Sequence, residues 1–262
     1  MKNKIISLIT DFGTQDGYVG AMKGRILSIV PDATIVDITH DIEPQNLIQS
    51  LWTVFRSTRQ FPEDSIHVVV VDPGVGSNRR PILLRSDNRW YIGPDNGVFS
   101  EIIRRSGCQA VYEIHRKTEW WQAHTSFDGL VLFAPSAAYL AAGKSLGKIG
   151  KIYEGELVDI DFPHPQKTHK DLLGEIVLFD RFGNAITNIK SSDLEQLPSK
   201  SIIIKCRDDS FVLVDHYQQE KNQEAIALIN SDGFLELSLY QSSAQQHFEL
   251  KASAPVRITW AI

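Results

Sequence analysis

The spacing of apolar residues changes near residue 159 of this 262-residue chain, and this change constrains the fold more than any other feature. Before that point, short β-branched runs alternate with segments whose apolar residues recur at helical spacing. The run His67–Val71 is almost entirely β-branched, as expected for a strand that is buried on both faces. This alternation predicts a three-layer, Rossmann-like α/β domain with a mostly parallel sheet.

The elements expected in this N-terminal domain follow from the same spacing. Its strands are expected at Ile5–Thr10, Thr34–Thr39, His67–Val71, Ile82–Arg85, Trp90–Ile92 and Ala110–Ile114. Its helices are expected at Tyr18–Val30, Asn46–Arg59, Val98–Arg105 and Leu132–Ala142.

The rest of the chain contains only short strand-like runs that are separated by turns. A polar, proline-containing segment at 161–171 is typical of a linker. Turn clusters after it predict a small β-barrel or sandwich. We therefore expect an α/β domain over 1–156, a linker over 157–172 and an all-β domain over 173–262. The strands of the all-β domain are expected at Gly174–Phe179, Ala185–Ile189, Ile202–Lys205, Phe211–Val214, Ala225–Asn230, Phe234–Leu239 and Val256–Trp260.

Composition argues against two classes of partner. The formal net charge is −5 and no Lys/Arg block exceeds two residues, so we expect no nucleic acid as a partner. The longest apolar run, 66–71, is far shorter than the roughly 20 residues of a membrane span, so no membrane partner is expected. The N-terminal apolar stretch is too short for a signal peptide, which predicts a cytoplasmic protein.

The sequence also lacks the usual patterns of metal and nucleotide sites. Cys108 and Cys206 lie far apart, and the eight histidines show no HExxH-like spacing, so we expect no metal. The glycine patterns GxGxxG and GxxxxGK[ST], which hold phosphates, do not occur. We therefore expect no cofactor.

Polar residues directly follow the expected strands. Asp11 follows the first strand, His40 and Asp41 the second, Asp72 the third, and the loop Gly93–Gly97 a later one. In parallel α/β sheets, ligands bind outside the carboxyl ends of the strands. Carboxylates at this edge favour a hydroxyl-rich or cationic ligand.

Six segments, in this order along the chain, carry a resemblance to a known family. They are DFGTQDGYVGAMKG (11–24), VDPGVGSNRRP (71–81), GPDNG (93–97), FDGLVLFAP (127–135), FDRFGNAITNI (179–189) and INSDGFLEL (229–237). Together they resemble the S-adenosylmethionine (SAM) hydroxide adenosyltransferases, relatives of fluorinating and chlorinating enzymes. The resemblance implies a β-barrel C-terminal domain and hydrolysis of SAM to adenosine and L-methionine, by attack of water on the ribose 5′ carbon. It also implies a homotrimer whose active sites lie between the N-terminal domain of one subunit and the C-terminal domain of its neighbour.

The resemblance implies roles in substrate binding for five residues. Asp11 matches an aspartate that accepts hydrogen bonds from both ribose hydroxyls. Phe127 would line the sugar pocket, with plain core packing as the alternative. Asp180 and Asn184 match the segment that meets the methionine amine and the adenine. Ser231 matches the position that contacts the methionine carboxylate, with a plain turn residue as the alternative.

The implied catalytic residues are Asp72, Arg79 and Asp128. Asp72 and Arg79 match residues that hold the attacking water, although Arg80 is an alternative to Arg79. Asp128 departs from the family, whose hydrolases usually carry a histidine there. We hypothesise that Asp72 and Asp128 lie near one water and act as a coupled general base, with Arg79 offsetting part of their repulsion. The alternative is a protein that binds SAM or adenosine with weak or no hydrolase activity.

Overall fold

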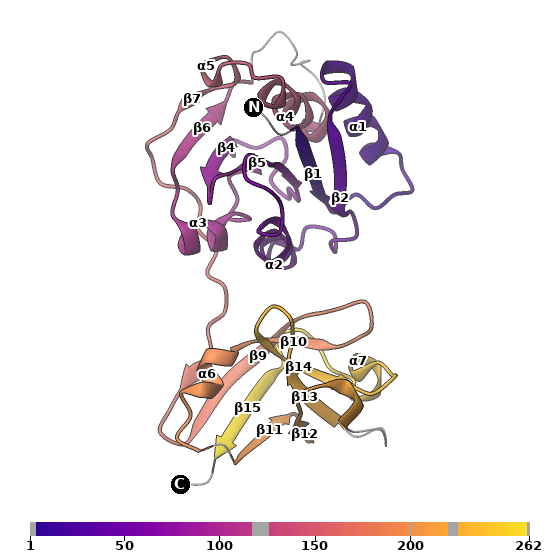
Figure 1. Ribbon diagram of the computed structural model, residues 1–262, viewed down its shortest axis with the longest axis vertical. Coiled ribbons are helices and arrows are strands. Elements are labelled where there is room, and N and C mark those ends of the chain that lie inside the picture. The colour runs from indigo at the N-terminus through magenta and orange to yellow at the C-terminus, as the bar shows by residue number, and fades with distance from the viewer. Residues whose placement is uncertain (1–3, 117–125, 200, 220–224, 261–262) are drawn as a thin grey trace. The chain divides into compact units, whose positions relative to one another are not determined.

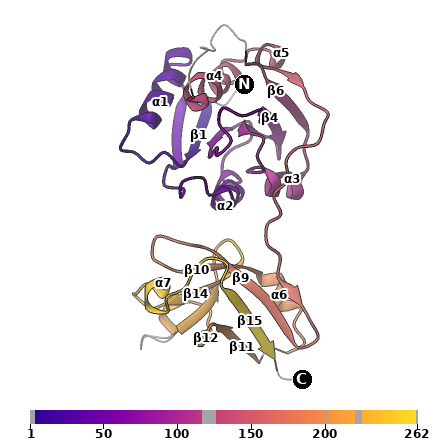
Figure 2. The same cartoon turned by 180° about the vertical axis from the view of Figure 1, so that it is seen from behind.

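The computed structural model describes residues 4–116, 126–199, 201–219 and 225–260. The chain forms two compact units, Met1–Asp161 and Phe162–Ile262. Figures 1 and 2 show helices around a mixed sheet in the first unit and a β-barrel in the second. The predicted fold class, an α/β domain followed by an all-β barrel, is confirmed. Among the residues described, no helix is both long enough and apolar enough to span a membrane.

The first unit is built on a seven-stranded sheet with the order β2-β1-β3-β5-β4-β6-β7. Its parallel pairings are β1–β2, β1–β3 and β3–β5, whereas β4–β5, β4–β6 and β6–β7 are antiparallel. The strands are β1 (Ile5–Thr10), β2 (Thr34–Thr39), β3 (Ile66–Val70), β4 (Pro81–Ser86), β5 (Arg89–Pro94), β6 (Ala110–Ile114) and β7 (Gly150–Ile152).

A tight hairpin reverses the strand direction between β4 and β5. Asp87 and Asn88 join β4 to β5 with φ angles of 49° and 56°, as a two-residue type I′ turn requires. Because β4 runs antiparallel to both β5 and β6, β6 points the same way as β1, β3 and β5. The carboxyl ends of these four strands and the start of β4 therefore lie at one edge of the sheet, which we call the functional edge.

Helices pack on the sheet in two pairs. Apolar residues of α1 and α4 share a core with alternate residues of β1 and β3, such as Ile6, Leu8 and Val68. The second pair is α2 and α3, and the side chain of Asn46 caps α2 by accepting from the Gln49 N–H. The helices are α1 (Tyr18–Ile29), α2 (Leu47–Thr58), α3 (Ser100–Ser106), the π-helical turn η1 (Gly129–Phe133), α4 (Ala134–Ala141) and α5 (Leu146–Ile149).

The second unit is a closed barrel rather than a sandwich. Its strands follow the order β10-β14-β13-β12-β11-β15-β9, and β9 pairs with β10 to close the ring, so that these strands leave no open edge. The short β8 (Gln166–Lys167), inside the segment expected to be a linker, pairs with β9. The barrel strands are β9 (Asp171–Phe179), β10 (Ala185–Lys190), β11 (Ile202–Cys206), β12 (Asp209–Leu213), β13 (Ala225–Ile229), β14 (Phe234–Leu239) and β15 (Pro255–Trp260).

Apolar side chains at alternate positions of the barrel strands fill the barrel core. In β15, Val256, Ile258 and Trp260 are buried and belong to this core, whereas Pro255 and Arg257 are exposed. The short helices of this unit are α6 (Ser191–Glu195), the 3-10 turn η2 (Tyr217–Gln219) and α7 (Ala244–His247).

A fully buried histidine lies in the middle of the sheet. The Nδ1 atom of His67, in β3, lies 2.7 Å from the Ser7 hydroxyl oxygen, and its ring packs between those of Phe61 and Tyr91. Burial, and to a lesser extent the charge of Arg89, lowers the pKa of His67 from 6.5 to about 3. The folded protein therefore holds this histidine in its neutral form.

The buried histidine should make stability depend on pH. Between pH 6.5 and about 3 the unfolded chain binds a proton at His67 that the folded chain does not, so the free energy of unfolding should fall as pH falls. The slope from this group is at most about 1.4 kcal/mol per pH unit. Urea unfolding of the wild type and His67→Gln between pH 7 and 4.5 measures it. The variant should have the shallower slope, and parallel curves would contradict this assignment.

Candidate active site

Four charged side chains meet at the functional edge. Asp72 lies two residues after β3, Arg79 two residues before β4, and Arg116 two residues after β6. Asp128 directly precedes η1. These segments reach the same edge because of the strand directions described above, so residues far apart in sequence become neighbours. We call Asp72, Arg79, Asp128 and Arg116 the ion cluster.

Arg79 links the two carboxylates that the sequence indicated. Its Nε donates to Asp72 Oδ2 at 2.8 Å, and its Nη2 donates both to that oxygen and to Asp128 Oδ2, the latter at 2.6 Å. The side chains of Asp72, Arg79 and Asp128 are only 6, 7 and 7% exposed. A guanidinium therefore lies between the two carboxylates and offsets their repulsion.

Arg80, the alternative partner, has another role. Its Nε and Nη2 donate to Asp95 Oδ2 at 2.9 and 2.6 Å, and its guanidinium stacks 4.7 Å from the ring centre of Tyr153. Consecutive residues at the start of a strand point to opposite faces, so only one of the two arginines reaches Asp72. That arginine is Arg79.

Arg116 contributes a second cation, and the sequence analysis did not identify it. Its Nη1 donates to Asp128 Oδ2 at 3.2 Å, and its Nη2 donates to the backbone carbonyl of Arg79 at 3.4 Å. A signal was present, because Arg116 closely follows the expected strand Ala110–Ile114, as Asp11 and Asp72 closely follow theirs. To place Arg116 at the functional edge, one must know the direction of β6, which depends on its antiparallel pairing with β4.

A cavity of about 190 Å³ lies beside the ion cluster. Four of the residues singled out from the sequence line it: Asp11, Asp72, Phe127 and Asp128. The rings of Phe12, Tyr18 and Phe127 form an aromatic cluster with centroids 5.1 to 5.8 Å apart, which gives the cavity an apolar side. The other lining residues are Phe12, Gln45, Val70, Val75, Ser126 and Gly129.

Asp11 is fixed at this cavity by the loop before α2. Its Oδ2 accepts from the Gln45 N–H at 2.9 Å, and Gln45 has a φ of 65°, which is uncommon for a residue other than glycine. The loops after β1 and β2 are joined because the Gly13 N–H donates to the carbonyl of His40 at 2.8 Å. The Nδ1 atom of the buried His40 ring also lies 2.9 Å from the hydroxyl oxygen of Thr10, the residue before Asp11, so His40 helps to hold the Asp11 loop.

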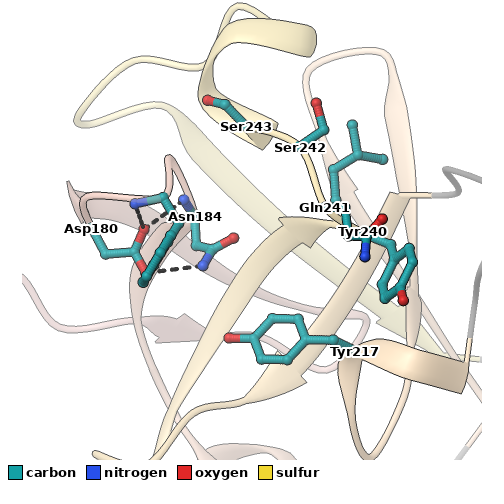
Figure 3. A pocket seen from close by; sticks show the side chains of 9 residues that line it. Asp180, Asn184, Tyr217, Tyr240, Gln241, Ser242 and Ser243 are labelled. Atoms are coloured by element: carbon teal, nitrogen blue, oxygen red, sulfur yellow. Dashed lines mark hydrogen bonds between the residues drawn. The ribbon is translucent and has the colours of Figure 1, made fainter.

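A second pocket, of about 580 Å³, lies in the barrel unit. Figure 3 shows the Asp180–Asn184 turn on one side of it and Tyr240 with Gln241 on the other. Asp180 Oδ1 accepts from the backbone N–H of Phe182 and of Asn184, and its Oδ2 accepts from the Asn184 side chain, each at 2.9 Å. The remaining lining residues are Tyr217, Leu239, Ser242 and Ser243, and the lining residue Phe182 is 77% exposed.

A buried carboxylate supports the barrel pocket. Glu236 accepts hydrogen bonds from Tyr217 at 2.6 Å and from Ser238 at 2.8 Å. Burial, followed by the contact with Glu236, raises the pKa of Tyr217. Tyr217 and Glu236 were not identified from the sequence, because neither follows a strand of the α/β sheet.

Ser231 does not line the barrel pocket. It lies in the turn between β13 and β14, where the carbonyl of Gly233 accepts from the Ser191 N–H at the end of β10. Asn184 precedes the start of the same strand. The structure therefore brings Asp180 and Asn184 together but places Ser231 near the opposite end of β10.

Two other kinds of site were considered at the described residues, a nucleophile elbow and a metal site. The segment 143–147 has the spacing GxSxG, but it runs from the loop after α4 into the start of α5 rather than following a strand, so Ser145 does not occupy a strand-to-helix elbow. Within the described ranges, no group of three or more His, Cys, Asp or Glu side chains is placed to hold a metal ion.

Comparisons with known proteins agree on one family. The model of the SAM hydroxide adenosyltransferase N-terminal domain matches residues 6–150, and that of the C-terminal domain matches residues 174–257. The chain is 37% identical over 254 residues to an (R)-S-adenosyl-L-methionine hydrolase of Methanocaldococcus jannaschii, covering 92% of this chain and 90% of the relative. It is 27% identical over 291 residues to a fluorinase of Nocardia brasiliensis, covering 98% and 97%. The crystal structure of an uncharacterized conserved protein from Thermotoga maritima superposes with a TM-score of 0.89 at 28% identity, over 97% of this chain and 100% of that one.

Proposed function

This chain belongs to the SAM hydroxide adenosyltransferase family, and on this premise we propose that it hydrolyses S-adenosyl-L-methionine to adenosine and L-methionine. The observation that carries the proposal is the placement of two buried carboxylates, Asp72 and Asp128, on the wall of one cavity that Asp11 also lines. SAM carries ribose hydroxyls and a cationic sulfur, and carboxylates stabilise both kinds of group.

The proposed reaction needs a water molecule in line with the bond between the ribose 5′ carbon and sulfur. The water oxygen bonds to the 5′ carbon as the carbon–sulfur bond breaks, and the electron pair stays on sulfur, which becomes the neutral thioether of methionine. A carboxylate accepts the proton that the water loses. We assign this role to Asp72, because it pairs with one guanidinium whereas Asp128 pairs with two.

Arg79 is assigned to hold the reacting groups in place. Its Nη1 is buried and has no hydrogen-bond partner among the described residues. A buried donor of this kind in a folded protein usually bonds to water or to a ligand. This buried donor supports a role for Arg79 in positioning the two carboxylates, Asp72 and Asp128, which themselves line the cavity.

The remaining roles are those that the family resemblance implies. In this proposal Asp11 holds the ribose hydroxyls and Phe127 lines the sugar site. Asp180 and Asn184 meet the methionine amine and the adenine. Ser231 is assigned to the methionine carboxylate on the resemblance alone.

We further propose that the chain acts as a cytoplasmic homotrimer, in which two neighbouring subunits complete each active site. The proposal would explain why candidate binding residues occur in both units of the chain. Analytical ultracentrifugation with and without SAM measures the assembly. A monomer that turns over SAM at full rate would contradict it.

The proposed function is tested by incubating the purified chain with SAM and separating the products by chromatography. We expect adenosine and methionine in equal amounts, and in water enriched in ¹⁸O the label should appear in the 5′ hydroxyl of adenosine. Added chloride should not change the product, because the anionic Asp72 disfavours a halide at the reaction centre. Binding of SAM without adenosine release, or a product that requires chloride, would overturn the proposal.

A glycine beside the cavity provides a test of its shape. A Cβ at Gly129 would lie 2.7 Å from Cε2 of Phe127 and 3.2 Å from the Met22 sulfur. Gly129→Ala should therefore displace the Phe127 ring, cost about 1–3 kcal/mol of stability and weaken adenosine binding. Calorimetric titration with adenosine measures the effect. Gly24→Ala in α1 is the matched control, since its added Cβ meets no atom within 4 Å beyond its chain neighbours and the nearby backbone of its own helix. Equal adenosine affinity in the two variants would contradict the assignment of this cavity.

A further inference from the structure

The charges of the ion cluster balance only when Arg116 is counted. Asp72 and Asp128 contribute two negative charges, and Arg79 contributes one positive charge, all on side chains that are at most 7% exposed. A buried charge without a partner is strongly unfavourable. Arg116 supplies the second positive charge, so the four side chains together are neutral.

The geometry of Arg116 shows how it contributes. Its Nη1 lies 3.2 and 3.5 Å from the two oxygens of Asp128, and its Nη2 reaches the carbonyl of Arg79 at 3.4 Å. The planar guanidinium thus joins the end of β6 both to the carboxylate and to the backbone of its partner arginine. A lysine would supply the charge but not this two-point contact.

Arg116 lies outside the cavity that we assign to the substrate. Its side chain is 35% exposed, and it is not among the residues that line the cavity, whereas Asp128 is. Any effect of Arg116 on the reaction therefore passes through Asp128 and Arg79.

We propose that Arg116 is a positioning residue for the hydrolysis, which balances the charge of Asp128 and holds its carboxylate in place so that Arg79 is shared between two carboxylates. This inference rests on the proposed function. It explains how a carboxylate is accommodated where the family usually carries a histidine: Asp128 adds one negative charge to the site, and Arg116 adds one positive charge.

The test is a cycle of four proteins: the wild type, Arg116→Gln, Asp128→Asn and the double variant. Arg116→Gln should lower kcat by roughly tenfold, the effect of losing one charge-assisted hydrogen bond, and change KM by less than about twofold. Arg116→Lys should recover only part of the lost rate, because it restores the charge but not the two-point contact. In the Asp128→Asn background, Arg116→Gln should change kcat by less than about twofold, because its target is already neutral.

Arg104→Gln is the matched control. Arg104 is 33% exposed and pairs with two carboxylates, those of Glu101 and Asp159, away from the cavity. The Arg104→Gln variant should have the same kcat as the wild type. A kcat of Arg116→Gln within twofold of the wild type would overturn the inference. The inference would also be overturned if Arg116→Gln lowered kcat equally in the Asp128→Asn background, or if Arg104→Gln lowered kcat as much as Arg116→Gln does.

A second measurement separates this inference from the proposed function. If the wild type releases no adenosine, the proposed function fails, but the pairing is still tested by urea unfolding of the same four proteins. Arg116→Gln should raise the unfolding equilibrium constant by roughly five- to tenfold in the wild type. The increase should be much smaller when Asp128 is already Asn, because only the contact with the Arg79 carbonyl then remains to be lost. Equal effects in both backgrounds would show that Arg116 does not act on Asp128.

Discussion

Replacing Asp72 by Asn is expected to lower kcat by about 10²- to 10⁴-fold, the range that a general base usually contributes. The amide keeps the size of the side chain but cannot accept the proton that the attacking water loses. It also presents an N–H group or a weaker acceptor to Arg79, whose Nε and Nη2 both donate to Asp72 Oδ2 in the wild type. Steady-state kinetics of adenosine release measure the effect, and KM should change much less than kcat.

Asp64→Asn is the control for this experiment. Asp64 lies just before β3, at the opposite end of the strand from Asp72, and pairs with Arg85 at 3.0 Å. Its φ of 62° is one that asparagine tolerates well. We expect wild-type kinetics for Asp64→Asn. A kcat of Asp72→Asn within tenfold of the wild type would exclude Asp72 as the proton acceptor.

Replacing Arg79 by Gln is expected to have the largest effect on stability. The change removes the cation shared by Asp72 and Asp128, whose side chains are 6 and 7% exposed. Breaking a buried ion pair by removing one partner costs about 3–5 kcal/mol, because the remaining charge is left without compensation. The kcat should also fall, since both carboxylates lose their common anchor. Urea unfolding at neutral pH measures the loss of stability.

The double variant Arg79→Gln/Asp128→Asn shows whether the loss is electrostatic. It removes one cation and one anion, so it should recover part of the stability that Arg79→Gln loses. Arg104→Gln, an exposed ion pair, should change the free energy of unfolding by about 1 kcal/mol or less. A loss for Arg79→Gln as small as that of Arg104→Gln would show that the ion cluster does not hold its carboxylates as charged groups.

Much of the fold could be predicted from apolar spacing, because buried residues recur at the spacing of a helix or of a strand. The expected strands Ile5–Thr10, Ala110–Ile114 and Phe234–Leu239 have the bounds that the structure gives them. The short β7 and β8 were not expected, since strands of two or three residues are too short to show an alternating pattern of apolar residues. The half-antiparallel sheet was not expected either. The turn at Asp87–Asn88 reverses the strand direction without changing the apolar pattern of the strands it joins.

Chain order and local chemistry identified most candidate site residues, because polar residues that closely follow buried strands are exposed at a sheet edge. Asp11 and Asp72 were found in this way, whereas Phe127 and Asp128 became candidates only through the family resemblance. All four residues line one cavity. Spacing alone does not show which charges touch. That Arg79 and not Arg80 reaches Asp72 depends on the side-chain direction at the start of β4.

The sequence by itself determined the two units, the edge at which the chemistry lies and the residues that follow each strand, since these depend on local burial and on chain order. Only the tertiary structure decided that Arg116 joins the site. Its place depends on the direction of β6, which is set by pairing with a strand nearly thirty residues away, and on the need to balance buried charges that come from four separate segments.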